Sequence, residues 1–197
     1  MADRDALQRE LDEHLVVARD AAGLLPTVAE LAERICTALD GGGTVIAFGN
    51  GGSAAEAQHL AGELLGRFRD TRRPLRAIAL STDTSVVTCI ANDFSFDDVF
   101  ARQVEALAAA GDVAIGISTS GGSENVVRAL RAARERGATA VAWTGRDPGP
   151  AGEAADVVLA VPSTTTARIQ EVHTLLMHMI CVAIDDWVAR TGGRGAA

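Results

Sequence analysis

The chain has 197 residues, of which 48% are hydrophobic and 22% are charged, and its formal net charge is −8 at pH 7. This length and composition are typical of one soluble globular domain, and the net negative charge argues against nucleic-acid binding. All 18 cationic residues are Arg, so the absence of Lys excludes a lysine-dependent P-loop and a Schiff-base mechanism.

Localisation and redox state are suggested by two further features. Residues 1–19 carry charges throughout, and no continuous apolar run approaches the ~20 residues that span a bilayer. We therefore expect a cytoplasmic protein with neither a signal peptide nor a membrane partner. Cys36, Cys89 and Cys181 are odd in number and far apart, so we expect buried free thiols instead of a disulfide framework or a zinc knuckle.

Residues 1–40 predict two helices that pack on the main domain. Leu7, Leu11 and Leu15 recur at helical spacing, and Gly23 and Pro26 end this first pattern. A second apolar pattern follows over residues 27–39. We expect residues 41–190 to form the main domain and residues 191–197 to be a flexible tail.

A strand, a glycine-rich turn and a helix are predicted in succession from residue 44 onward. The apolar run Val45–Phe48 has the length of a buried strand, and the turn Gly49-Asn50-Gly51-Gly52 follows it. Ser53 then opens a helix as its N-cap. Free backbone amides at a helix N-terminus bind anions, so the sequence predicts a phosphate site here. Its candidate contacts are Asn50, Gly51, Gly52 and Ser53.

The same predicted helix carries His59 and Glu63, which lie four residues apart and therefore on one face. Such a pair is a weak signal by itself, but small neighbouring residues leave room for a ligand beyond the anion site. The pair is a candidate acid/base or metal-binding face. Arg67, one turn further on, is a candidate contact for a bound anion.

A second strand is predicted at residues 77–80, followed by a polar segment over residues 81–98 that reads as a loop with a short helix. Asn92 and Asp93 lie in this segment. Three phenylalanines follow, and we expect them in the core: Phe94, Phe96 and Phe100.

A third strand at residues 113–117 leads into a second small polar turn before another helix, which extends to about Arg136. This repeats the plan of the first unit, with hydroxyls and backbone amides where other proteins use Lys. The hydroxyl residues of this second predicted anion site are Ser118, Thr119, Ser120 and Ser123.

The fourth and fifth strands are predicted at residues 139–143 and 157–161, with a Gly/Pro-rich loop over 145–152 between them. Five short apolar runs alternating with helices indicate an α/β fold in which an open parallel sheet has helices on both faces. Ligands of such sheets bind at the carboxyl ends of the strands, where both polar turns lie.

The last predicted helix, residues 166–190, has apolar residues on several faces, as expected for a helix in a subunit interface. It also carries Gln170, His173 and His178, and we interpret His173 as structural. Gln170 and His178 are ~12 Å apart along a straight helix, which is awkward for two ligands of one ion. Either the helix begins after Gln170, or the two residues serve different sites in different subunits.

Four motifs in order resemble the phosphoheptose isomerase branch of the sugar isomerase (SIS) domain family. They are GNGGSAAEAQHLAGELLGRF, ANDFSFDDVFARQ, GDVAIGISTSGGSENVVRAL and ARIQEVHTLLMH. The resemblance covers residues 40–190. It implies a flavodoxin-like three-layer SIS fold, with the N-terminal helices and the C-terminal helix in the core of a homotetramer whose sites lie at subunit interfaces.

The resemblance also implies an activity: interconversion of sedoheptulose 7-phosphate and D-glycero-D-manno-heptose 7-phosphate through an enediol. It implies one Zn²⁺ per subunit, on residues matching His59, Glu63, Gln170 and His178. Glu63 and His178 match the acid/base pair. The residues that match substrate contacts are Asn50, Gly51, Gly52, Ser53, Glu63, Arg67, Asn92, Asp93, Ser118, Thr119, Ser120, Ser123 and Gln170. The chain departs from the family pattern at Gly122, where Asn is frequent, and at Ala167, where some members have Asp.

Three alternatives remain open. A non-catalytic SIS tetramer that binds a replication initiator shares the same turns, but Glu63 and His178 favour the enzyme. Gly49, Gly51 and Ala54 fit a dinucleotide-binding G-x-G-x-x-A pattern, without the acidic residue expected at the end of the second strand. A phosphosugar-sensing regulator would need a DNA-reading module, and the sequence shows none.

Overall fold

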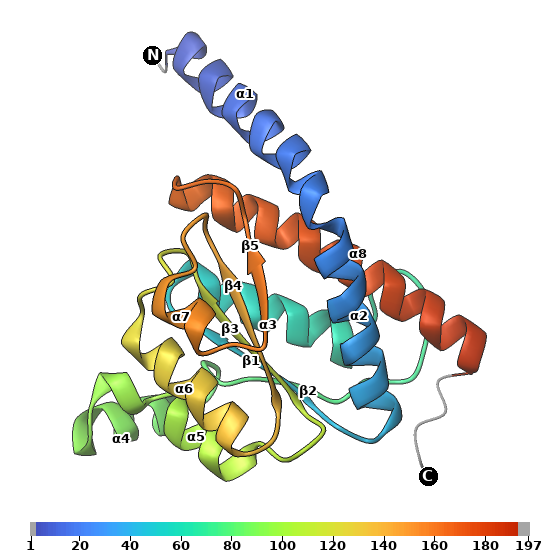
Figure 1. Ribbon diagram of the computed structural model, residues 1–197, viewed down its shortest axis with the longest axis vertical. Helices are drawn as coiled ribbons and strands as arrows, with labels where there is room; N and C mark the ends of the chain where they lie inside the picture. The colour runs from blue at the N-terminus through green and yellow to red at the C-terminus, as the bar shows by residue number, and fades with distance from the viewer. Residues whose placement is uncertain (1–2, 193–197) are drawn as a thin grey trace.

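The five predicted strands form one parallel sheet in a computed structural model that describes residues 3–192 (Figure 1). The strand order is β2-β1-β3-β4-β5. Their bounds are β1 Val45–Gly49, β2 Ala77–Ala79, β3 Val113–Ser118, β4 Thr139–Thr144 and β5 Val157–Ala160. Each predicted strand is confirmed to within one residue at its end.

Helices connect and cover these strands. The α-helices are α1 Arg4–Asp20, α2 Leu25–Asp40, α3 Gly52–Leu65, α4 Thr84–Asp93, α5 Ala101–Leu107, α6 Glu124–Glu135, α7 Gly149–Glu153 and α8 Thr166–Thr191. Two short 3-10 helices are η1 Ala21–Leu24 and η2 Phe96–Asp98. The Gly/Pro-rich stretch predicted as a loop therefore contains the short helix α7.

The sheet is buried on both faces, as the unbroken apolar strands require. On β1, Val45 and Ala47 join the cluster formed with α2, α3 and α8, whereas Ile46 and Phe48 join the cluster formed with α5 and α6. Alternate residues of the other strands divide in the same way. The predicted three-layer arrangement of helices, sheet and helices is confirmed.

The start of α3 differs from the prediction. The helix begins at Gly52, with Gly51 as its N-cap, and Ser53 makes no cap hydrogen bond because it lies inside the first turn. Gly51 has φ = 56°, a conformation that glycine adopts without steric cost. The prediction that Ser53 caps the helix is wrong: the left-handed turn at Gly51 starts the helix one residue earlier.

The segment around α4 holds two further corrections. Phe94 and Phe96 are 57% and 56% exposed, whereas Phe100 is buried, so only one of the three phenylalanines belongs to the core. The guanidinium of Arg102 covers the Phe94 ring, with Cζ 3.7 Å from the ring centroid. Cys89 on α4 is exposed, so the prediction of three buried thiols holds only for Cys36 and Cys181.

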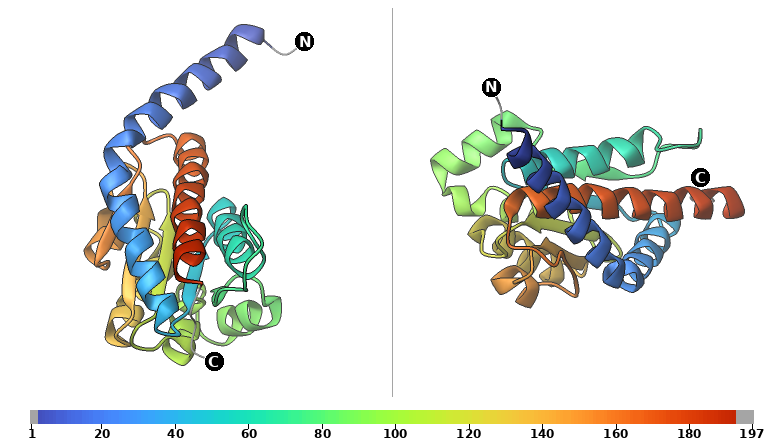
Figure 2. Two further views of the ribbon diagram at one scale, coloured as in Figure 1. Left: turned by 90° about the vertical axis from the view of Figure 1, so that its right-hand side faces the viewer. Right: turned by 90° about the horizontal axis from the view of Figure 1, so that it is seen from above.

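Helix α1 extends away from the sheet and carries the chain's N-terminal end with it (Figures 1 and 2). Its leucines Leu7, Leu11 and Leu15 are all more than half exposed. Pro26 lies in the first turn of α2, so it begins the second helix rather than ending the first. Helix α2 belongs to the same apolar core as α3 and α8.

Helix α8 lies alongside α3 in both further views (Figure 2) and is buried on several sides, as predicted. Length and apolar composition alone would allow it to cross a membrane, a test that the core helix of a soluble protein also passes. Here it packs on α1, α2 and α3. It continues to Thr191, which the prediction had assigned to the tail; residues 193–197 of that predicted tail lie outside the described residues.

Candidate active site

The two predicted anion turns lie side by side, because they follow the neighbouring parallel strands β1 and β3. The side chains of Asn50 and Asn125 join them: each amide donates one hydrogen bond of 2.9 Å to the other. Asn125, in the first turn of α6, is buried. Because the Asn50 amide is used in this way, Asn50 offers a ligand its backbone more readily than its side chain.

The second turn gathers the hydroxyls predicted there. Ser118 Oγ donates to Ser123 Oγ at 3.0 Å and lies 3.5 Å from Ser120 Oγ. Ser123 is the N-cap of α6 but makes no side-chain cap bond, so the first backbone amides of that helix are not bonded by its hydroxyl. The backbone amides at the start of α6 and the cluster of hydroxyls together offer an anion uncharged hydrogen-bond donors.

Helices α3 and α8 meet along a seam of three paired positions. At the start of α3, a side chain at Gly52 would overlap the Gln170 amide, so that amide lies directly on the backbone of Gly52. One turn further on, Thr174 Oγ1 donates to Glu56 Oε2 at 2.9 Å.

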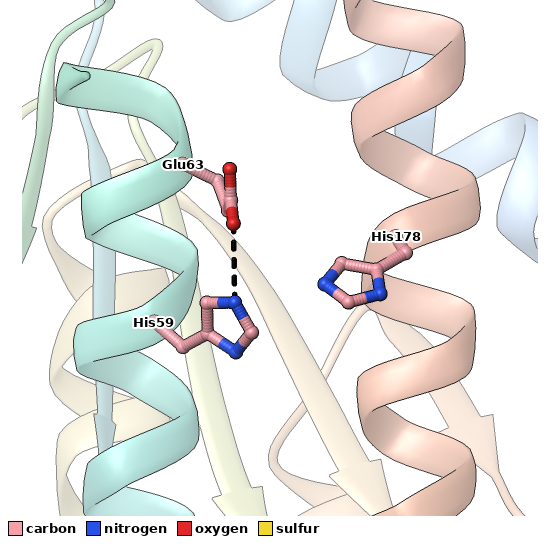
Figure 3. Close-up of side chains that lie close together, drawn as sticks. All are labelled: His59, Glu63 and His178. Atoms are coloured by element: carbon pink, nitrogen blue, oxygen red, sulfur yellow. Dashed lines mark hydrogen bonds and ion pairs between the residues drawn. The ribbon is translucent and has the colours of Figure 1, made fainter. Parts of the chain in front are cut away.

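At the third pairing of the seam, the rings of His59 and His178 meet edge-on, with centroids 5.2 Å apart. The Glu63 carboxylate joins them from one turn further along α3 (Figure 3). His59 Nε2 lies 3.1 Å from Glu63 Oε1, and one ligand atom from each of the three residues lies within 4.8 Å of the other two. The structure thus brings the Glu63 carboxylate and the His178 imidazole, which lie on separate helices, close together within one chain.

The donor set of His59, Glu63 and His178 fits a zinc ion, because imidazole nitrogen and carboxylate oxygen are common zinc ligands and two nitrogens plus one oxygen leave positions open. His59 is exposed and Glu63 is half-buried, so a ligand can approach.

Gln170 is held apart from this cluster by the geometry of α8. The helix is continuous from Thr166, so the alternative in which it begins after Gln170 is wrong. Gln170 lies two turns before His178, beside Gly52, at the end of the seam nearest the anion turns. The other alternative, in which Gln170 and His178 serve different sites in different subunits, remains the prediction for this pair.

His173 and Glu56 are buried groups beside the seam. Burial lowers the pKa of His173 to about 4, although its hydrogen bond to the Thr144 carbonyl opposes the shift. The interpretation of His173 as structural agrees with its complete burial. Burial also raises the pKa of Glu56, while Thr174 and His59 act in the opposite direction.

Other predicted contacts lie further from the cluster. Asn92 and Asp93 are exposed on α4, and the Asn92 amide donates to Asp93 Oδ1 at 2.8 Å. The guanidinium of Arg67 donates to the backbone carbonyl of Arg69 at 3.5 Å. Among the described residues, no hydrogen bond joins these three side chains to either anion turn.

Sequence reasoning missed three residues of the site. Phe68 stacks on His178, with ring centroids 5.2 Å apart, and Asn125 joins the two turns. Arg72 donates to the backbone carbonyl of Glu63 at 2.7 Å. Phe68 and Arg72 lie in the Arg-rich link, which reads as solvated surface. Only the position of Asn125 directly after the second polar turn pointed to the site.

Comparisons with known proteins identify the family of this chain. The sequence profile of the SIS domain matches residues 17–145. The chain is 53% identical over 161 residues to the phosphoheptose isomerase of Aquifex aeolicus, covering 82% of this chain and 84% of that protein.

Solved structures give the same result. The phosphoheptose isomerase from Neisseria gonorrhoeae superimposes with a TM-score of 0.88 at 44% identity, covering 93% of this chain and 98% of that one. The phosphoheptose isomerase from Francisella tularensis superimposes with a TM-score of 0.90 at 35% identity, covering 94% and 100%. The resemblance found in the sequence is therefore confirmed: the chain belongs to the SIS domain family, with the phosphoheptose isomerases as its relatives, and it is an isomerase.

Proposed function

We propose that this isomerase interconverts sedoheptulose 7-phosphate and D-glycero-D-manno-heptose 7-phosphate. The observation that carries the proposal is the meeting of Glu63 and His178, from two helices, within 4.8 Å of each other, with Glu63 on a helix, α3, that begins at one of the two anion turns. The names of the similar proteins from Aquifex aeolicus and Neisseria gonorrhoeae support a phosphorylated heptose as substrate.

The phosphate would bind at the two turns through backbone amides and hydroxyls. The sheet brings the turns together, and the helices α3 and α6 that begin there present their positive ends to an anion. We propose these residues as substrate contacts: Asn50, Gly51, Gly52, Ser53, Glu63, Arg67, Asn92, Asp93, Ser118, Thr119, Ser120, Ser123 and Gln170. The seam from Gly52 to His59 then leads from the phosphate toward the acid/base pair.

Glu63 and His178 would transfer the protons. Converting the ketose removes one proton from C1 and delivers one to the C2 carbonyl oxygen, which forms the enediol. The enediol then gains a proton at C2 and loses the proton of its O1 hydroxyl. A carboxylate and an imidazole that both reach the substrate can exchange these protons near neutral pH.

We further propose one Zn²⁺ per subunit, held by His59, Glu63 and His178, with Gln170 as the fourth ligand that the family resemblance implies. Because Gln170 lies two turns from His178 in its own chain, this fourth ligand would come from another subunit. When bound, the ion would act as a Lewis acid on the sugar oxygens. His59 would only bind the metal, whereas Glu63 and His178 would bind the metal and also exchange protons with the substrate.

We propose a cytoplasmic homotetramer with its sites at subunit interfaces and residues 41–190 as the SIS domain. The exposed leucines of α1 and the apolar faces of α8 support self-association. Single exposed apolar side chains are common on protein surfaces, but leucines exposed along one side of a helix indicate a surface that binds another apolar surface. Residues 1–40 would then add helices to this domain and to the assembly.

One experiment tests the activity. The purified protein is incubated with sedoheptulose 7-phosphate, with and without a chelator, and aldose formation is followed by NMR. We expect aldose to accumulate without chelator and to stop accumulating with it. A protein that leaves the ketose unchanged in the presence of Zn²⁺, and that instead retains a replication initiator in a pull-down, would support the non-catalytic alternative.

A further inference from the structure

A buried ion pair lies just beyond the acid/base pair, between the link that follows α3 and the second half of α8. Arg72 Nε lies 2.9 Å from Asp185 Oδ1, and the side chains are only 4% and 6% exposed. Replacing such a pair by apolar residues is frequently neutral or stabilising, so a buried pair is weak evidence for stability alone. Its contacts indicate a different role.

Arg72 holds the end of α3. Its guanidinium donates to the carbonyl oxygens of Glu63 at 2.7 Å and Leu64 at 2.9 Å. The last carbonyls of a helix have no partner within the helix, and a cation at this end is favoured by the helix dipole. Arg72 thus fixes the backbone of the residue that carries the proposed acid/base carboxylate.

Asp185 holds the link itself. Its Oδ2 accepts hydrogen bonds from the backbone amides of Arg69 at 3.1 Å and Asp70 at 3.4 Å. Burial acts to raise the pKa of Asp185, but the hydrogen bonds from Arg72 and these two amides together lower it. The residue next to this anchored backbone is Phe68, whose ring stacks on the His178 imidazole.

One ion pair therefore acts on both members of the proposed acid/base pair. Arg72 contacts the Glu63 backbone directly, and Asp185 acts on His178 through the link and Phe68. Asp185 also lies two turns after His178 on the same helix, so the pair ties α3 to α8 close to the site.

We infer that Arg72 and Asp185 are positioning residues that set the separation and orientation of the Glu63 carboxylate and the His178 imidazole. This inference rests on the proposed function of Glu63 and His178. It gives the Arg-rich link a role that the composition of the segment did not indicate.

The test compares Asp185→Asn with a matched change at the other end of the sheet. Asp112 is also buried and also accepts two backbone amides, from Thr44 at 2.7 Å and Ala109 at 2.8 Å. Asp112 precedes β3, whereas the site lies beyond the carboxyl ends of the strands, so Asp112→Asn removes an equivalent buried carboxylate without touching α3 or α8.

Three quantities are measured for each variant: kcat, KM, and the NMR shifts of the His178 ring protons in metal-free protein, assigned with His178→Gln. We expect Asp185→Asn to lower kcat by about 10²-fold, because small misplacements of catalytic groups cost this much. We expect KM to change by less than about twofold, because Arg72 and Asp185 do not contact the turns at which the substrate phosphate is proposed to bind. The His178 ring shifts should move, since the Phe68 ring would no longer be held over them. Asp112→Asn should leave all three quantities at their wild-type values.

Wild-type kcat and His178 shifts in Asp185→Asn would overturn the inference, as would equal losses in Asp112→Asn. If Asp185→Asn does not fold, Arg72→Lys takes its place, because Lys keeps the charge but has one nitrogen where Arg72 bonds Asp185, Leu64 and Glu63 through three different nitrogens of a planar group. A wild-type protein without isomerase activity would overturn the proposed function instead, and the His178 shifts would then decide the positioning on their own.

Discussion

Asn50 and Asn125 exchange two hydrogen bonds of 2.9 Å, one in each direction, between the turn after β1 and the first turn of α6. The pair links the two proposed phosphate-binding turns directly to each other, whereas the other backbone hydrogen bonds of the second turn, from Gly145 to the Thr119 carbonyl and from Ala151 to the Gly121 carbonyl, tie it to the segment after β4. The amide group suits this role, since it offers one donor and one acceptor to an identical partner.

We expect Asn125→Leu to raise KM for the heptose phosphate by about tenfold, because the Asn50 amide loses both partners and the unpaired group costs about 1–3 kcal/mol. The inhibition constant of inorganic phosphate should rise in parallel, whereas kcat should change little. Steady-state kinetics with phosphate as a competitor measures both constants. An unchanged KM together with a lower free energy of unfolding would show that the amide pair serves stability only.

We expect Glu63→Gln and His178→Ala each to lower kcat by at least about 10²-fold, since general acid/base catalysis typically contributes 10²–10⁴-fold. The assembly, measured by light scattering, should remain that of the wild type. Glu30→Gln is the matched control: Glu30 is exposed on α2, where it pairs with Arg34. A fully active Glu63→Gln protein would remove Glu63 from the mechanism.

We expect one zinc ion per subunit to be lost on dialysis against chelator, together with the activity. In His59→Ala the dissociation constant for Co²⁺, followed by its visible absorption, should rise by at least about 10²-fold, because even residues behind the ligands change affinity by 10–100-fold. His14→Ala is the control, since His14 bonds Glu171 at 2.7 Å where α1 meets α8. Equal Co²⁺ affinities in the two variants would rule out His59 as a ligand.

His173 should make stability depend on pH. Burial holds its pKa at about 4 in the folded protein, below its ordinary value of 6.5. The unfolded chain therefore binds a proton below pH 6.5 that the folded chain does not bind. The contribution of His173 to the free energy of unfolding should fall as the pH drops from 6.5 to about 4, by up to about 3 kcal/mol.

Urea unfolding of metal-free wild type and His173→Gln at several pH values measures this effect as the difference between the two proteins. Gln keeps a donor for the Thr144 carbonyl, which His173 Nε2 bonds at 3.1 Å, but does not titrate. Parallel pH profiles for the two proteins would contradict the prediction.

The apolar periodicity of the chain determined the fold class. The five strands are short runs of buried residues, and their alternation with helices requires crossover connections, which give a parallel sheet with both faces covered. In this arrangement the carboxyl ends of β1 and β3 lie at the same edge of the sheet. The positions of the two polar turns were therefore found without any tertiary information, as were His59 and Glu63 on one face of α3, and anion binding at the turns stays a prediction.

Tertiary structure decided which distant side chains meet. His178 reaches His59 and Glu63 only because α3 and α8 pack side by side in register, and no pattern within either helix encodes that register. The same reason explains why the Asn50–Asn125 pair was not foreseen. Helix starts such as Gly51 depended on a single backbone angle, which local propensity does not specify.

The Arg-rich link shows the limit most clearly. Its composition is that of a solvated surface, yet Arg72 is buried against Asp185, more than a hundred residues further along the chain. A charge becomes buried only where a distant partner and free helix carbonyls compensate its desolvation, and their positions are properties of the folded chain. The sequence by itself thus determined the sheet, the turns and the candidate chemistry, and the packing of α8 on α3 decided how the proposed acid/base groups are held.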